Sequence, residues 1–194
     1  MKLIGLTGGV GMGKSTAASF LLSQGVRLID TDDLARQLVQ RGQPALAEIA
    51  GVFGSALLTA SGELDRVALA QIVFADAAAR RKLEAILHPR IRAGWQTQVE
   101  AWRQENCPLA VVVIPLLFET LAESAFDKIV CVACLPASQT ERLAGRGWNP
   151  EQIRQRIASQ MPIEQKITRS HLVIWSEGTI EAHRQQVGRI LSRL

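Results

Sequence analysis

The chain has 194 residues, 47% of them hydrophobic, and a formal net charge of +4. This length and composition suit one α/β domain with insertions and a substantial buried core. The longest apolar run, Leu109 to Phe118, is shorter than the roughly 20 residues that cross a bilayer, and the three cysteines indicate a reducing compartment. We therefore expect a cytoplasmic protein with no membrane partner.

The first predicted strand, residues 2–7, runs into a glycine-rich loop and then into a helix that we expect to begin near Lys14. The loop, Gly8 to Ser15, matches the pattern G-x-x-x-x-G-K-[ST] at every fixed position. Its glycines let successive N–H groups cradle phosphate oxygens beside a helix N-terminus, while the lysine reaches the β- and γ-phosphates and the serine ligates Mg²⁺. The sequence thus predicts an ATP and Mg²⁺ site at Gly9, Val10, Gly11, Met12, Gly13, Lys14, Ser15 and Thr16.

The second predicted strand, residues 26–30, ends in a cluster of aspartates. In doubly wound sheets the ligand crevice lies at the carboxyl ends of the strands, and in extended geometry Asp30 and Asp32 face it together. A carboxylate near a γ-phosphate orients an acceptor hydroxyl and accepts its proton, or holds a water on Mg²⁺. We expect Asp32 to act in this way and Asp33 to cap the next helix.

The interval between the second and third strands is far longer than a crossover helix requires. Helices are predicted over 33–41, 44–53, 65–75 and 76–105, the last bent near Pro89, with Asp65 and Asp76 as N-caps. We expect this insertion, residues 33–105, to be a helical domain that holds the acceptor substrate. A helical buttress without a ligand is the alternative.

The third and fourth predicted strands, 109–114 and 128–134, lack two nucleotide-hydrolase signatures. Pro115 stands where a Walker-B aspartate usually follows the third strand, and no guanine-reading N-K-x-D pattern follows the fourth. Motors and switches place that aspartate on Mg²⁺, so we favour a small-molecule kinase. Cys131 and Cys134 lie three apart on a strand and point to opposite faces, which argues against a redox or zinc pair.

The segment before the last predicted strand, residues 171–175, contains two helices and several arginines. Gly145 and Gly147 end the first helix, and Asn149 begins the second as its N-cap. We expect residues 137–165 to be a lid that closes over phosphates. The near-continuous apolar strands, alternating with helices, predict an α/β P-loop NTPase fold. Its core would comprise a five-stranded parallel sheet in residues 1–32, 106–136 and 166–194.

Four segments in this order resemble the motifs of dephospho-coenzyme A kinases: GLTGGVGMGKST at 5–16, IDTDDLAR at 29–36, LHPRI at 87–91 and VVIPLLFE at 112–119. Their order and spacing hold over nearly the whole chain. The resemblance implies transfer of the γ-phosphoryl group of ATP to the ribose 3′-hydroxyl of dephospho-coenzyme A. It also implies a three-part kinase with a sheet core, a helical substrate domain and a lid.

The resemblance also implies roles for single residues. Asp32 would be the catalytic aspartate, acting with Lys14, and Arg142 would be the lid arginine near the nucleotide, with Arg146 a weaker candidate. Ser15 and Asp32 would hold Mg²⁺. The acceptor side would consist of Asp30, Arg36, His88, Pro89, Leu116, Leu117 and Glu119. For His88, a core role before the proline of its helix is an equal alternative.

Two residues depart from the pattern that this family usually carries at the fifth strand. His171 stands in place of an aspartate and Ser176 in place of an asparagine, which concerns the adenine side rather than the phosphate chemistry. A shikimate-type kinase is the nearest alternative, but its usual glycine run after the third strand is replaced here by PLLFE. A nucleic-acid-linked P-loop ATPase is a second alternative, against which the chain has no basic tract and only 5% aromatic residues. We expect a monomer that binds no nucleic acid.

Overall fold

The structure, a computed structural model, describes residues 1–193 and forms two compact units. The first, here called the sheet unit, comprises residues 1–30 together with the chain from residue 102 onward. The second, here called the helical unit, comprises residues 31–101. Among the described residues, no helix is long and apolar enough to cross a membrane.

The sheet unit is built on a five-stranded sheet in the order β2-β3-β1-β4-β5. All four strand pairs are parallel, which confirms the predicted sheet. Near-continuous apolar sequence makes β1, β3 and β4 almost fully buried, as a sheet covered on both faces requires. The strands are β1 (Lys2–Gly8), β2 (Arg27–Asp30), β3 (Leu109–Val113), β4 (Lys128–Ala133) and β5 (Leu172–Trp175).

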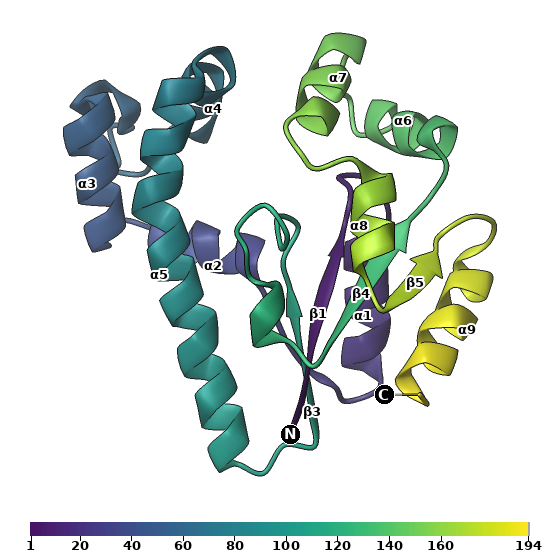
Figure 1. Cartoon of the computed structure of the whole chain (residues 1–194). Helices are drawn as coiled ribbons and strands as arrows, with labels where there is room; N and C mark the ends of the chain where they lie inside the picture. Colours follow the sequence, from purple (N-terminus) through teal and green to yellow (C-terminus); the bar gives the residue numbers. More distant parts are fainter. Residues whose placement is uncertain (194) are drawn as a thin grey trace. The chain divides into compact units, whose positions relative to one another are not determined.

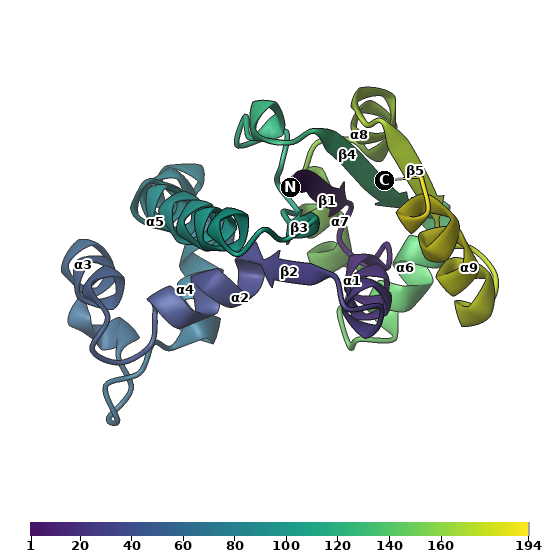
Figure 2. The ribbon, with the colours of Figure 1, turned by 90° about the horizontal axis from the view of Figure 1, so that it is seen from below.

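Helices cover both faces of this sheet. Figure 2 shows α1 (Lys14–Ser23) and α9 (Ile180–Leu191) on one face, and α8 (Ile163–Arg169) on the other. Two further helices, α6 (Pro136–Ala144) and α7 (Pro150–Ala158), lie beyond the carboxyl end of β4 (Figure 1). A short 3₁₀ turn, η2, precedes β4 at Glu123–Ala125. The glycine-rich loop after β1 and the helix α6 after β4 therefore both follow strands at the carboxyl edge of the sheet.

The helical unit has its own apolar core. Its helices are α2 (Thr31–Leu38), α3 (Pro44–Phe53), α4 (Arg66–Ala75) and α5 (Ala77–Gln104), with a 3₁₀ turn, η1, at Ser55–Leu57. In Figure 1, α3 and α4 lie alongside α5. Buried side chains from α3, α4 and α5 meet in this core, among them Ile49, Leu69 and Ile86, together with Val39 just after α2. The helix α5 continues into the sheet unit, since the boundary between the units falls at residue 101.

The helix ends test the predicted caps. The Asp65 carboxylate accepts hydrogen bonds from the N–H groups of two residues in the first turn of α4, and Asn149 forms a complete capping box with Gln152. Both predictions are confirmed. The prediction that Asp33 is an N-cap is wrong, because α2 begins two residues earlier, at Thr31.

Candidate functional site

The glycine-rich loop leads from β1 into α1, as predicted, with Lys14 as the first helical residue. Gly13 precedes it as N-cap at φ 94°, a conformation that favours glycine, and no side chain caps the helix. The N–H groups of the first turn are therefore not used by a capping side chain. Together with the partial positive charge of the helix N-terminus, they form a site that suits an anion.

The amino group of Lys14 lies over the loop. It donates hydrogen bonds to the main-chain oxygens of Gly8 at 2.9 Å and Gly9 at 2.8 Å. The neighbouring Ser15 is exposed at the start of α1. Its hydroxyl is a hard oxygen ligand of the kind that Mg²⁺ accepts, so Ser15 can supply one protein ligand to this ion. Among the described residues, no three histidine, cysteine or acidic side chains gather into a metal site of their own.

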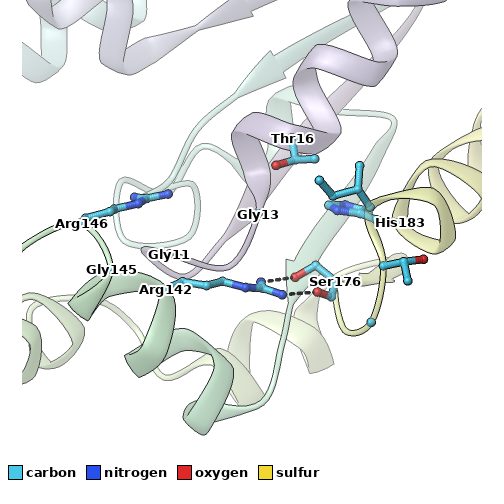
Figure 3. A pocket seen from close by; sticks show the side chains of 11 residues that line it. Gly11, Gly13, Thr16, Arg142, Gly145, Arg146, Ser176 and His183 are labelled. Carbon is cyan, nitrogen blue, oxygen red and sulfur yellow. Dashed lines mark hydrogen bonds between the residues drawn. The ribbon is translucent and has the colours of Figure 1, made fainter.

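A pocket of about 500 Å³ opens beside the loop. Gly11, Gly13 and Thr16 line one part of it, and Arg142 and Ser176 line another. Figure 3 shows the Arg142 guanidinium pointing at Ser176. One of its nitrogens donates to the Ser176 hydroxyl at 2.9 Å and the other to the Ser176 main-chain oxygen at 2.5 Å. The structure thus brings the predicted lid arginine next to the predicted phosphate loop, and Arg146 lines the same pocket.

The two residues that depart from the family pattern both make anchoring contacts. The buried hydroxyl of Ser176 donates to the main-chain oxygen of Met12 at 2.7 Å. The His171 ring nitrogen Nδ1 accepts from the N–H of Ile129 at 3.0 Å, and the His171 N–H donates to the Ile129 oxygen at 2.9 Å. His171 therefore ties the start of β5 to β4, and Ser176 ties the end of β5 to the loop.

His183 is a pocket residue that the sequence analysis missed. It lies on α9, is 5% exposed, and its ring meets that of Phe20 edge-on at 5.8 Å. Among the described residues its Nε2 atom has no hydrogen-bond partner. Burial, and secondarily the nearby Arg142 charge, lowers the pKa of His183, so the ring is neutral at pH 7. The signal in the sequence that could have indicated His183 is its position four residues after Thr179, the N-cap of α9.

The segment after β3 contains three of the predicted acceptor residues. Leu116 is half-buried, whereas Leu117 is fully buried and packs over Gly5 of β1. The expectation that Leu117 contacts an acceptor is therefore corrected: its side chain belongs to the core. Glu119 pairs with the fully buried Lys166, whose amino group lies 2.8 Å from Glu119 Oε1 and donates to the Pro115 oxygen at 2.7 Å.

The remaining acceptor-side residues lie at the end of β2, in α2 or on α5. Asp30 is the last residue of β2, and Asp32 lies in the first turn of α2. The expectation of extended geometry from Asp30 to Asp32 is wrong, because β2 ends at Asp30, opposite Val113 of β3, and α2 begins at Thr31. Arg36 is exposed and pairs with Asp33, and Pro89 lies inside α5 directly after the half-buried His88.

The three cysteines are free thiols. Cys131 and Cys134 are buried, and Cys107 is half-buried. Burial raises the pKa of Cys131 to about 11 and also raises the pKa of Cys134. Neither of the two buried thiols is a nucleophile at neutral pH.

Comparison with known proteins places these features in one family. A family model described as dephospho-CoA kinase matches residues 2–182. A dephospho-CoA kinase from Anaeromyxobacter dehalogenans is 42% identical over all of this chain and 92% of its own length. A solved protein from Thermus thermophilus superposes with a TM-score of 0.82 at 33% identity, covering 100% of this chain and 97% of its own. A dephospho-CoA kinase from Campylobacter jejuni gives a TM-score of 0.69 at 25% identity, covering 99% and 96%.

Proposed function

Since this chain belongs to the dephospho-CoA kinase family, we infer that it transfers the γ-phosphoryl group of ATP to the ribose 3′-hydroxyl of dephospho-coenzyme A, the last step of coenzyme A biosynthesis. The structural observation that carries this inference is the complete phosphate loop, with Lys14 over it and Arg142 in the adjoining pocket. The two alternatives, a shikimate-type kinase and a nucleic-acid-linked ATPase, have no comparable support.

On the donor side, we propose that the N–H groups from Gly9 to Thr16 hold the phosphates of ATP. Lys14 already lies at this loop. Its positive charge would stabilise the negative charge that develops on the β- and γ-phosphates during transfer. Ser15 and Asp32 would hold Mg²⁺. When bound, this ion would neutralise phosphate charge.

We propose that the adenosine part of ATP binds in the pocket beside the loop. Its guanidinium groups suit both phosphate oxygens and the faces of aromatic rings. Arg142 is held in the pocket by Ser176, and His183 adds a neutral ring there. The pocket volume of about 500 Å³ suits a small molecule of this size.

On the acceptor side, we propose Asp32 as the group that orients the 3′-hydroxyl and accepts its proton late in the transfer. Asp32 lies in the first turn of α2, at the start of the helical unit. A carboxylate beside an acceptor hydroxyl can orient it and accept its proton. As residues that bind the acceptor we propose Asp30, Arg36, His88, Pro89, Leu116 and Glu119.

We also propose that the helical unit holds the acceptor and that residues 137–165 act as a lid. Arg142 of α6, Arg146 just after that helix and the pocket that both arginines line support the lid. The free cysteines support a reducing compartment, and hence the cytoplasm. We further propose that the chain works as a monomer and binds no nucleic acid.

The test is a steady-state assay of ADP release with two acceptors offered separately. We expect turnover with dephospho-coenzyme A and only background with shikimate. The Lys14→Ala variant should lose at least about 100-fold in kcat, because it removes the charge that stabilises the transferring phosphoryl group. Turnover with shikimate alone, or DNA-stimulated ATP hydrolysis without an acceptor, would overturn the assignment.

A further inference from the structure

Two glutamine side chains converge on one residue of the glycine-rich loop. The amide nitrogen of Gln139, on α6, donates to the main-chain oxygen of Val10 at 2.7 Å. The amide oxygen of Gln160, just after α7, accepts from the Val10 N–H at 2.9 Å. The two glutamines are 129 and 150 residues away from Val10 in sequence. Both polar main-chain groups of Val10 are thus satisfied by the segment predicted to be the lid.

The position of Val10 in the loop makes these two contacts important for the phosphate cradle. Val10 lies after the end of β1, where no strand supplies partners for its N–H and C=O groups. The next residue, Gly11, has φ 75°, and glycine there leaves the main chain free to rotate. Without the two side chains, the Val10 main-chain groups would turn to other partners, and the N–H groups of the next loop residues would turn with them.

The segments that carry the two glutamines are themselves held in place. Gln139 is only 5% exposed, so its amide is held in one place by packing. The residue after Gln160 is Met161, whose N–H donates to Glu119 Oε1 at 2.8 Å. That same oxygen pairs with the buried Lys166, which also holds the Pro115 oxygen after β3. The chain at residues 160–161 therefore links the tip of the loop to the end of β3.

We propose that Gln139 and Gln160 are positioning residues that clamp Val10 and thereby set the geometry of the phosphate cradle. This inference rests on the proposed function, since it assigns the cradle to ATP. Neither glutamine needs to touch the nucleotide, because each acts through the main chain of Val10. The clamp also makes nucleotide affinity depend on the segment 137–165, which carries both side chains.

The test compares Gln160→Met and Gln139→Leu with a matched control, Gln155→Leu. Met keeps the length of the side chain and removes the amide acceptor. Gln155 is exposed on α7, and among residues 1–193 its side chain bonds only with Glu151. We expect the KM for ATP and the Kd for ADP to rise about 5- to 10-fold in each clamp variant. The KM for dephospho-coenzyme A should stay within about twofold, and the control should match the wild type in every constant.

A second readout works without turnover. Hydrogen–deuterium exchange of the loop in the nucleotide-free protein should be at least about 5-fold faster in the clamp variants, because the Val10 N–H loses its acceptor. The double variant should weaken ADP binding by less than the product of the single effects, since both contacts hold one residue.

Two results would overturn the clamp: loop exchange and ADP affinity within twofold of the wild type in both single variants, or an equal rise in the KM of both substrates. If calorimetric titration of the wild-type protein with ADP gave no heat, the proposed function would be contradicted, and the proposed clamp with it. Thermal unfolding of each variant confirms that the folded protein is being compared.

Discussion

Ser176 donates a hydrogen bond from its buried hydroxyl to the main-chain oxygen of Met12 over 2.7 Å, and so joins the end of β5 to the glycine-rich loop. The same hydroxyl accepts from Arg142. Ser176→Ala removes both contacts and leaves the Met12 oxygen without this donor. We expect about a 5-fold rise in the KM for ATP and a loss of about 1–2 kcal/mol in the free energy of unfolding.

The matched control for this prediction is Ser192→Ala. Ser192 is the exposed C-cap of α9, and within the described part of the chain its hydroxyl bonds only to the Arg189 oxygen. Steady-state kinetics and urea unfolding of both variants provide the comparison. If Ser176→Ala behaved as Ser192→Ala does, the contact with Met12 would have no role in shaping the loop.

Gly8 cannot be replaced by a residue with a side chain. Its φ is 143°, and an added Cβ would lie 2.1 Å from the main-chain oxygen of Val132 on the neighbouring strand. We expect Gly8→Ala to lower the free energy of unfolding by at least about 3 kcal/mol. Gly188→Ala is the control, because Gly188 lies in α9 with open space around it and should gain about 0.5–1 kcal/mol. Equal stabilities of the two variants, measured by urea unfolding, would contradict this account of the β1–β4 contact.

His183 should make stability depend on pH. Burial lowers its pKa in the folded protein below the ordinary value of 6.5. The unfolded chain therefore binds the proton first as the pH falls, so this residue's contribution is present above about pH 6.5 and is lost below it. His183→Phe keeps an aromatic ring against Phe20 and removes the titration. We expect the free energy of unfolding to fall more steeply between about pH 7 and 5 in the wild type than in the variant; parallel curves would rule out His183 as a source of the dependence.

The burial of the cysteines predicts how many thiols of the folded protein react with a thiol reagent. With a pKa of about 11, Cys131 is only about one-thousandth ionised at pH 8, and it is fully buried. Cys134 is also buried with a raised pKa, whereas Cys107 is half-buried. We expect one thiol to react rapidly in the native protein and three in guanidinium chloride. Rapid reaction of a second thiol in the native state would show that β4, or the residue directly after it, opens to solvent.

The strands and the phosphate loop could be predicted because their signals are local. Apolar runs mark β1 to β5 to within one residue at most ends, and the loop pattern fixes the start of α1 at Lys14. The path after β2 could not be predicted in this way. Whether the chain stays extended past Asp30 depends on where its partner β3 ends, and that is a matter of tertiary pairing.

The positioning contacts around the site were also beyond local reasoning. Leu117 is part of a motif that suggests a ligand contact, yet the missing side chain of Gly5 gives it a place in the core. Gln139 and Gln160 carry no motif that points to Val10, because each meets it only once α6 and α7 are folded over the sheet edge. Such contacts join segments more than a hundred residues apart, and no periodic pattern in the sequence indicates them.

The central claim is that Asp32 directs the acceptor hydroxyl at a phosphoryl group held by the glycine-rich loop. The most direct measurement is single-turnover transfer of radiolabel from γ-labelled ATP to dephospho-coenzyme A, by the wild type, Asp32→Asn and Asp33→Asn. Asp33 is the matched control, because it is the next acidic residue and pairs with the exposed Arg36. We predict labelled coenzyme A from the wild type and Asp33→Asn at similar rates, and a rate at least about 100-fold lower from Asp32→Asn. Transfer by Asp32→Asn at the wild-type rate would contradict the account.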